Sequence, residues 1–267
     1  MGRTDDVSAD PSPAPLVGVT KTSPSLWRAT FDSPPINLIG PRMLLELRAL
    51  LDAAERDDRL AVIVFDSADP DFFLAHWDIA ADPALINAIP LSRNGLHPWV
   101  DVLKRVSTLP AMTVSALRGR ARGAGSEFAL ATDIRFASRE RAVLSQFEVG
   151  GGAVPGGGPA SRLPRLVGRG RALEILLGAE DFDADTAERY GYVNRSVPDA
   201  DFDRFVDAFV QRVSRFDVRA IREVKAFVND VTLPDDEEVA PQMAAFTRSV
   251  ARPETQNLIG QLFALGL

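Results

Sequence analysis

Strand-like apolar runs alternate with helical segments through the middle of this chain, and that alternation is the strongest constraint on its fold. Residues 60–67, LAVIVFDS, form a continuous β-branched run typical of a buried strand. The segment before it, residues 43–58, has apolar residues at helical spacing: Leu44, Leu47, Leu51 and Ala54. Residues 111–117, AMTVSAL, predict another strand, followed by a short helix over 126–134. We therefore expect an α/β core.

Composition limits the classes of function. The 267 residues are 46% hydrophobic and 25% charged, which is ordinary for a globular protein. A formal net charge of −7 disfavours a nucleic-acid partner, whose binding surface is basic. The absence of cysteine and the presence of only two histidines disfavour a metal site. No apolar run is long enough for a membrane span and no signal peptide is recognisable, so we predict a cytoplasmic protein without a membrane partner.

Three segments are expected along the chain. Residues 1–22 are rich in Pro, Ser and Asp and predict a disordered tail. Residues 23–197 carry the alternating strands and helices and predict the core that holds the active site. Residues 198–267 are mainly helical by periodicity, and their abundant phenylalanines could cover a neighbouring subunit as readily as their own core.

A glycine-rich turn and an apolar helix meet in residues 119–134, GRARGAGSEFALATDI. Such a junction directs unpaired backbone N–H groups and the helix dipole at an anion, or at an oxygen that becomes anionic in a transition state. The dinucleotide and phosphate-loop fingerprints are absent. Glu127 lies in the first turn of this helix. From spacing alone, stabilisation by the helix dipole is the favoured interpretation, and catalysis is the alternative.

A second carboxylate, Glu148, stands shortly before another glycine-rich stretch, GGGAVPGGG at residues 150–158. Flexible glycine backbone can pass close to a ligand there. A lone glutamate in a loop is more commonly solvated. Two acids beside two glycine turns are also compatible with an acid/base pair, provided that Glu127 and Glu148 meet in space.

Four segments carry a resemblance to a known family over roughly residues 25–265: PAMTVSALRGRARGAGSEFALATDIRFAS, FEVGGGAVPGGG, FFLAHWDI and AERYGYVNRSVP. They resemble motifs of the crotonase superfamily, that of the enoyl-CoA hydratases and isomerases. In the first segment the positions in step are Gly119, Gly123, Gly125, Glu127, Ala129, Asp133, Ile134, Ala137 and Ser138. In the second, Glu148 lies seven residues before Pro155, as the family pattern requires.

The resemblance implies a crotonase-like spiral of ββα units followed by a helical trimerisation region, in a homotrimer or homohexamer. It implies an acyl-CoA thioester substrate, with no cofactor beyond the coenzyme A of the substrate itself. The thioester oxygen would be held by the backbone N–H groups of Trp77 and Ala124. Glu127 and Glu148 would be the catalytic acid and base, which makes catalysis the favoured interpretation of Glu127.

The same resemblance places Ala75, Gly123 and Gly151 beside the substrate. One departure concerns His76, which replaces the glycine of the family's A-G-x-D motif. Histidine tolerates positive φ better than most residues, and its ring could restrict the acyl pocket. It could instead serve as an acid/base group, or cap a loop with no chemical role.

His97, which precedes a predicted helix, is interpreted as structural. A serine-hydrolase site made from Ser126, His76 and Asp78 is disfavoured because the pattern G-x-S-x-G is absent.

These residues predict an enzyme that adds water to a 2-enoyl-CoA through an enolate. Isomerisation or another enolate reaction on an acyl-CoA is a second hypothesis. A third is a non-catalytic thioester-binding oligomer in which His76 has disabled the oxyanion loop.

Overall fold

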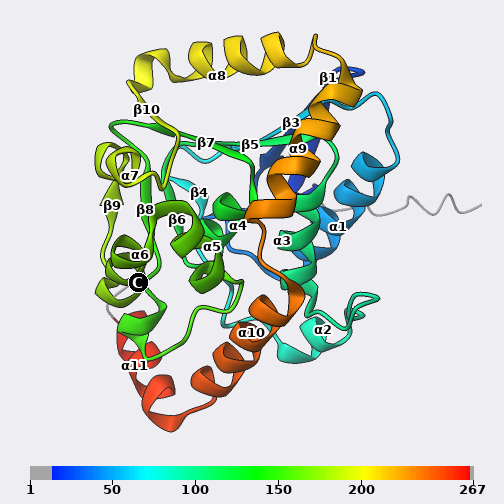
Figure 1. The fold of residues 1–267 in the computed structure, drawn as a ribbon. Coiled ribbons are helices and arrows are strands. Elements are labelled where there is room, and N and C mark those ends of the chain that lie inside the picture. Colours follow the sequence, from blue (N-terminus) through cyan, green and yellow to red (C-terminus); the bar gives the residue numbers. More distant parts are fainter. Residues whose placement is uncertain (1–13, 265–267) are drawn as a thin grey trace, which may run out of the picture.

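A computed structural model describes residues 14–264 of the chain, and it contains two β-sheets surrounded by helices (Figure 1). The strands are β1 Val17–Ser23, β2 Leu26–Phe31, β3 Val62–Ser67, β4 Phe72–Leu74, β5 Met112–Leu117, β6 Arg120–Arg122, β7 Ile134–Ser138, β8 Val143–Ser145, β9 Phe182–Asp183 and β10 Arg195–Val197. The helices of the core are α1 Pro41–Glu55, α2 Pro83–Asn87, α3 Pro98–Thr108, α4 Ala124–Ala131, the 3-10 turn η1 Glu148–Gly151, α5 Pro159–Val167, α6 Arg169–Gly178 and α7 Ala184–Tyr190. The C-terminal helices are α8 Asp199–Val213, α9 Val218–Thr232, α10 Asp236–Val250 and α11 Pro253–Ala264.

The chain moves repeatedly from one sheet to the other, as the expected spiral of ββα units requires. The larger sheet has the order β1-β2-β3-β5-β7-β10, and the smaller has the order β4-β6-β8-β9. Strands β3, β5 and β7 of the larger sheet therefore alternate along the chain with β4, β6 and β8 of the smaller one. Pairing is parallel in both sheets except at β1–β2 and β8–β9.

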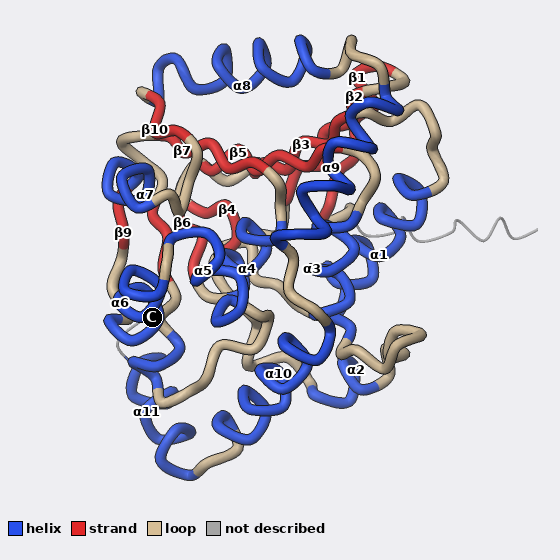
Figure 2. Tube along the Cα trace, viewed as in Figure 1, coloured by secondary structure: helices blue, strands red, loops and turns tan. Residues whose placement is uncertain are grey.

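The central strands of the larger sheet are buried on both faces. Along β3, Val62 and Val64 belong to a cluster with α8, whereas Ile63 and Phe65 belong to the main core with α1 and α3. Side chains of a strand point alternately to its two faces, so both layers of helices are needed to bury this run. Figure 2 shows the larger sheet as a band between α8 and the helices of the core. The predicted helix over 43–58 is confirmed as α1, with Leu44, Leu47, Leu51 and Ala54 buried.

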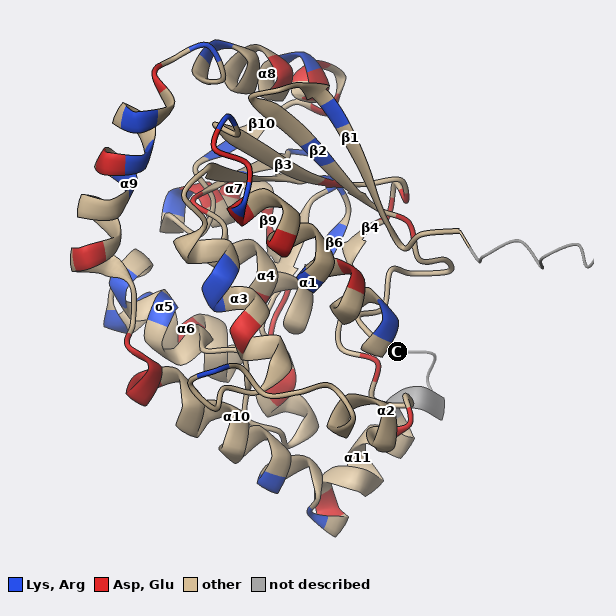
Figure 3. Cartoon of the chain, turned by 90° about the vertical axis from the view of Figure 1, so that its right-hand side faces the viewer, with Lys and Arg blue, Asp and Glu red and all other residues tan. Residues whose placement is uncertain are grey.

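The four C-terminal helices confirm the helical character predicted for residues 198–267. Helix α8 packs on β3, β7 and β10, whereas α10 returns to contact α3 and α5, and α11 reaches η1. Blue and red bands of charge alternate along the outward helices α8 and α9 (Figure 3). Oligomerisation through this region stays a prediction.

The N-terminal tail is shorter than expected. The sequence predicted a disordered tail over residues 1–22, but residues 17–22 belong to β1. This strand pairs antiparallel with β2, with Val17 opposite Phe31. The backbone N–H groups of Leu16 and Val17 also donate to Glu46 of α1, at 2.6 and 2.9 Å. Residues 1–13 lie outside the described residues.

Candidate active site

Two backbone segments that follow neighbouring strands form one side of the site. Strands β4 and β6 are parallel neighbours, with Leu74 opposite Ala121. Gly123 follows β6 with φ +50°, in the region that favours glycine, and α4 begins at the next residue. A Cβ at Gly125 would overlap the carbonyl oxygen of Leu74. The first turn of α4 therefore lies directly against the end of β4, and only glycine fits there.

The backbone N–H groups of Trp77 and Ala124 lie on these two segments. Ile39 forms a parallel bridge with Trp77: its N–H donates to the His76 carbonyl at 3.0 Å, and its own carbonyl accepts from Asp78 at 2.9 Å. Successive N–H groups of an extended chain point to opposite sides, so the Trp77 N–H points away from Ile39. Within residues 14–264, neither the Trp77 nor the Ala124 N–H has a protein acceptor. Both groups are available to a ligand oxygen.

Glu127 is buried, with 3% of its surface exposed, and both of its carboxylate oxygens accept hydrogen bonds. The indole Nε1–H of Trp99 donates to Oε2 at 2.8 Å, and the Gly157 N–H donates to Oε1 at 2.6 Å. Burial raises the pKa of Glu127 above its usual value, while these two donors oppose the rise. The carboxylate thus faces α3 and the second glycine stretch, in addition to lying in the first turn of α4.

The carboxyl group of Glu148, at the start of η1, is also buried, but it has fewer hydrogen-bond partners than that of Glu127. Its Oε1 would lie 2.9 Å from a Cβ at Gly123, which places this carboxyl group beside the first glycine turn. Its Oε2 is buried and, in the described part of the chain, has no hydrogen-bond partner. Burial raises the pKa of Glu148 to about 8, and the negative charge of Glu127 adds to that rise. The structure therefore brings the two predicted acids together.

The two carboxyl groups differ in the hydrogen-bond donors around them. Glu127 accepts hydrogen bonds from groups that can only donate, which stabilises its ionised form. Oε2 of Glu148 has no hydrogen-bond partner within the described residues, and the group is buried near another acid, so its protonated form is favoured. Two neighbouring acids in different environments can act as one base and one acid.

Sequence reasoning missed Trp99, Gly157 and Arg162 as members of this site. The positive charge of Arg162 acts on Glu127, and its Nη1 donates to Ser107 Oγ at 2.8 Å. Burial lowers the pKa of Arg162 to about 10, and its Nε is buried without an acceptor among residues 14–264. The family resemblance assigned roles only to selected motif positions, and these three residues were not among them. A tryptophan at the start of an amphipathic helix carries no such signal.

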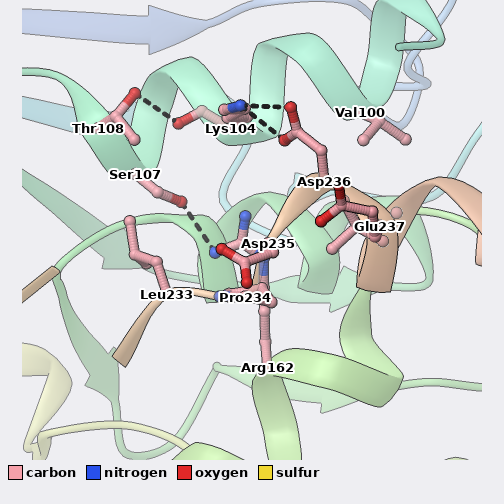
Figure 4. Close-up of a pocket in the computed structure, with 12 residues that line it drawn as sticks. Val100, Lys104, Ser107, Thr108, Arg162, Leu233, Pro234, Asp235, Asp236 and Glu237 are labelled. Carbon is pink, nitrogen blue, oxygen red and sulfur yellow. Dashed lines mark hydrogen bonds and ion pairs between the residues drawn. The ribbon is translucent and has the colours of Figure 1, made fainter. Parts of the chain in front are cut away.

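A cavity of about 290 Å³ lies beside these residues, between α3, α5 and the start of α10 (Figure 4). Its lining includes Gly157 and Arg162, but neither Glu127 nor Glu148. Lys104 crosses it to form an ion pair with Asp236, at 2.6 Å. The cavity therefore borders Glu127 on the side of Gly157 and Arg162.

His76 is half-buried and has a definite structural contact. Its Nδ1–H donates to the Trp77 carbonyl at 2.8 Å, and its ring meets the Phe147 ring edge-on, at 5.9 Å between centroids. In the part of the chain that the structure describes, positive φ outside glycine occurs at Asn37 and Ala179. His76 therefore occupies the family's glycine position without left-handed backbone, and the loop keeps its unpaired N–H at Trp77.

The other predicted residues have the following places. Ala75 is buried and its N–H donates to Asn37, while Gly151 is buried within η1. His97 caps α3, its Nδ1 accepting from the Trp99 N–H at 3.2 Å, as its structural interpretation expected. Ser126 hydrogen-bonds Tyr192, and no bond between Ser126 and His76 occurs among the described residues. A serine-hydrolase arrangement is therefore not formed.

Comparison with known families assigns residues 21–256 to enoyl-CoA hydratase/isomerase. The chain belongs to the enoyl-CoA hydratase/isomerase family. A candidate enoyl-CoA hydratase from Streptomyces avermitilis has a similar structure, with a TM-score of 0.90 and 43% identity over 97% of this chain and 93% of that one. The fold of an enoyl-CoA hydratase from Mycobacterium avium subsp. paratuberculosis is also similar, with a TM-score of 0.82 at 22% identity, covering 92% of this chain and 98% of that one.

A curated relative of this family member is the short-chain-enoyl-CoA hydratase of Clostridium acetobutylicum, 33% identical over 162 residues. The match covers 61% of this chain and 61% of that relative. Within residues 14–264, no cluster of three or more potential metal-ligating side chains occurs, and none of the helices has the length and apolarity needed to cross a membrane.

Proposed function

We propose that this family member is an enzyme that adds water to a 2-enoyl-CoA thioester. The observation that carries the proposal is the pair of buried carboxyl groups, Glu127 with donors at both oxygens and Glu148 with an unpartnered Oε2, beside two backbone N–H groups that have no protein acceptor within residues 14–264. Hydration needs one group that removes a proton from water and another that delivers a proton to the α-carbon. The pair matches both requirements.

In the proposed reaction, the thioester oxygen accepts hydrogen bonds from the N–H groups of Trp77 and Ala124. The Glu127 carboxylate takes a proton from water while the water oxygen bonds to the β-carbon. Electrons of the double bond move onto the thioester oxygen, and the resulting enolate is stabilised by the two N–H groups, each worth about 3–4 kcal/mol. The Glu148 carboxyl group then protonates the α-carbon, which gives a 3-hydroxyacyl-CoA. Proton exchange with solvent restores both acids, and no cofactor takes part.

Two features support this proposal over a binding protein with a disabled oxyanion loop. The Trp77 N–H has no protein acceptor within residues 14–264, although His76 replaces the family's glycine. The His76 side chain donates to the Trp77 carbonyl and does not occupy the Trp77 N–H. Isomerisation would use the same enolate but would return a proton to a different carbon, without water. Ala75 and Gly123 lie on the two backbone segments that the substrate would contact, and Gly151 lies in η1 with Glu148.

The test follows loss of the conjugated thioester absorbance with short and medium 2-enoyl-CoAs, for wild type, Glu127→Gln and Glu148→Gln. Hydration by wild type and its loss in both variants are expected. A parallel assay with a 3-enoyl-CoA detects isomerisation by the gain of the same absorbance. Thioester binding without turnover by wild type would contradict the proposal and would favour the binding protein.

We also infer that the protein forms a homotrimer or homohexamer. Helix α9 exposes large apolar side chains at the spacing of one helical face: Val224, Phe227, Val228 and Val231, between 52% and 81% exposed. An apolar stripe of this size on an outer helix favours burial against another subunit. A cytoplasmic location stays a prediction.

A further inference from the structure

Trp99 is fixed at both its main chain and its side chain. Its backbone N–H donates to the cap residue His97, and its indole Nε1–H donates to Oε2 of Glu127. The indole ring lies between Trp77 and Phe128, with centroids 5.8 and 6.4 Å away. Only 1% of Trp99 is exposed. Burial and these ring contacts restrict the indole, whose N–H points at the carboxylate.

The charges around Glu127 explain why that N–H matters. From α5, Arg162 attracts the carboxylate, and from η1, Glu148 repels it. From the loop before α5, the N–H groups of 156–157 donate to it. From α3, the contribution is the neutral indole of Trp99. A hydrogen bond to a buried charge is worth roughly twice one between neutral groups, so loss of the indole donor weakens the ionised form directly.

Resting on the proposed hydration, we infer that Trp99 is a positioning residue that stabilises the carboxylate of Glu127 and thereby makes Glu127 the base and Glu148 the acid. The contact is selective, because the indole is a donor only and cannot serve a protonated, donating carboxyl group equally well. Trp99 also packs on Trp77, so the same side chain joins the base to the segment that carries one of the proposed oxyanion N–H groups.

A pH titration followed by infrared spectroscopy tests this inference without substrate. The carboxyl absorption of Glu127 is identified as the signal that disappears in Glu127→Gln. In Trp99→Phe, which keeps most of the ring but lacks the donor, the midpoint of Glu127 is expected to move to higher pH. An unchanged midpoint would overturn the inference.

The chain offers a matched control in Trp27. This tryptophan is also 1% exposed, but its Nε1 has no partner within residues 14–264. Trp27→Phe therefore removes an equally buried indole and is expected to leave the Glu127 midpoint unchanged. Should Trp99→Phe fail to fold, benzothienylalanine at position 99, with sulfur in place of the N–H, gives an isosteric replacement and the same expected shift.

Kinetics supply the second readout. In Trp99→Phe, kcat for hydration is expected to fall by about 10- to 100-fold with little change in KM, and the acid limb of the pH profile to move to higher pH. In a Glu127→Gln background the same change should have no further effect. If wild type hydrates no 2-enoyl-CoA, the proposed function fails, whereas the infrared midpoint still decides the role of Trp99.

Discussion

Gly157 lies so close to Glu127 that its N–H donates to Oε1 at 2.6 Å while a Cβ in its place would overlap Oε2. The same Cβ would lie 2.7 Å from Leu103 Cδ1, so there is no space on the other side. The second glycine stretch is therefore shaped around the first carboxylate. This contact gives a stringent test of the site, because one added methyl group must displace the proposed base.

Gly157→Ala is expected to lower kcat by about 100-fold, since a displacement of the order of 1 Å at a reacting group has that effect. Overpacking should also lower the free energy of unfolding by about 1–3 kcal/mol. Steady-state hydration and urea unfolding measure both. Gly170→Ala is the control, because nothing lies within 4 Å of its Cβ position on α6. Equal kcat in the two variants would mean that Gly157 does not hold the base.

Glu148 should make the folded protein less stable as pH rises. Its folded pKa of about 8 exceeds the value of 4.5 usual for glutamate, so the unfolded chain releases this proton first. The free energy of unfolding is unaffected below pH 4.5, then falls up to about pH 8 by on the order of 5 kcal/mol. Urea unfolding of wild type and Glu148→Gln at several pH values measures this difference. Parallel profiles would refute a strongly raised pKa.

The rate of hydration should depend on the proton of Glu148. If Glu148 is the acid, kcat/KM falls as rising pH removes this proton, with an apparent pKa of about 8. The profile falls again at low pH, where Glu127 becomes protonated and can no longer accept a proton. Initial rates with one 2-enoyl-CoA across this range measure the profile. A rate that is constant or rising beyond pH 9 would exclude Glu148 as the acid.

His76→Ala should have a small effect on kcat. The side chain of His76 hydrogen-bonds the Trp77 carbonyl, and none of its hydrogen bonds among the described residues goes to Glu127 or Glu148. Loss of one neutral hydrogen bond predicts a fall in kcat of about 3- to 10-fold. A general acid or base at this position would instead contribute about 100-fold or more. Comparison of kcat for wild type and His76→Ala separates the two roles.

Phe227→Glu should dissociate the proposed oligomer, because it places a charge in the middle of the exposed stripe on α9. Light scattering on a gel-filtration column is expected to show a lower mass than that of wild type. Glu223→Gln, a change at an exposed polar position on the same helix, should keep the wild-type mass. A wild-type protein that is monomeric would contradict the inference of an oligomer.

The sequence singled out Glu127 and Glu148 because both stand in motifs with fixed spacing to glycines, and the structure places them near each other, while their catalytic roles stay a proposal. The sequence was not sufficient for Trp99, whose contact with Glu127 joins residues 28 positions apart and depends on how α3 packs on α4. The error at β1 has a different cause. The four consecutive residues 19–22 of β1 are exposed, so this edge strand lacks the apolar pattern of a buried strand.

Helix α4 has no solvent-facing side, since all eight of its residues are buried. Opening such a helix requires breaking much of the main core, so α4 belongs to the part of the molecule that opens least often. Helix α2, by contrast, buries no residue, and α10 buries two among its described residues, Val239 and Ser249. Any local unfolding that admits a bulky ligand is thus concentrated in the peripheral helices, while the glutamate on α4 stays in register with its donors.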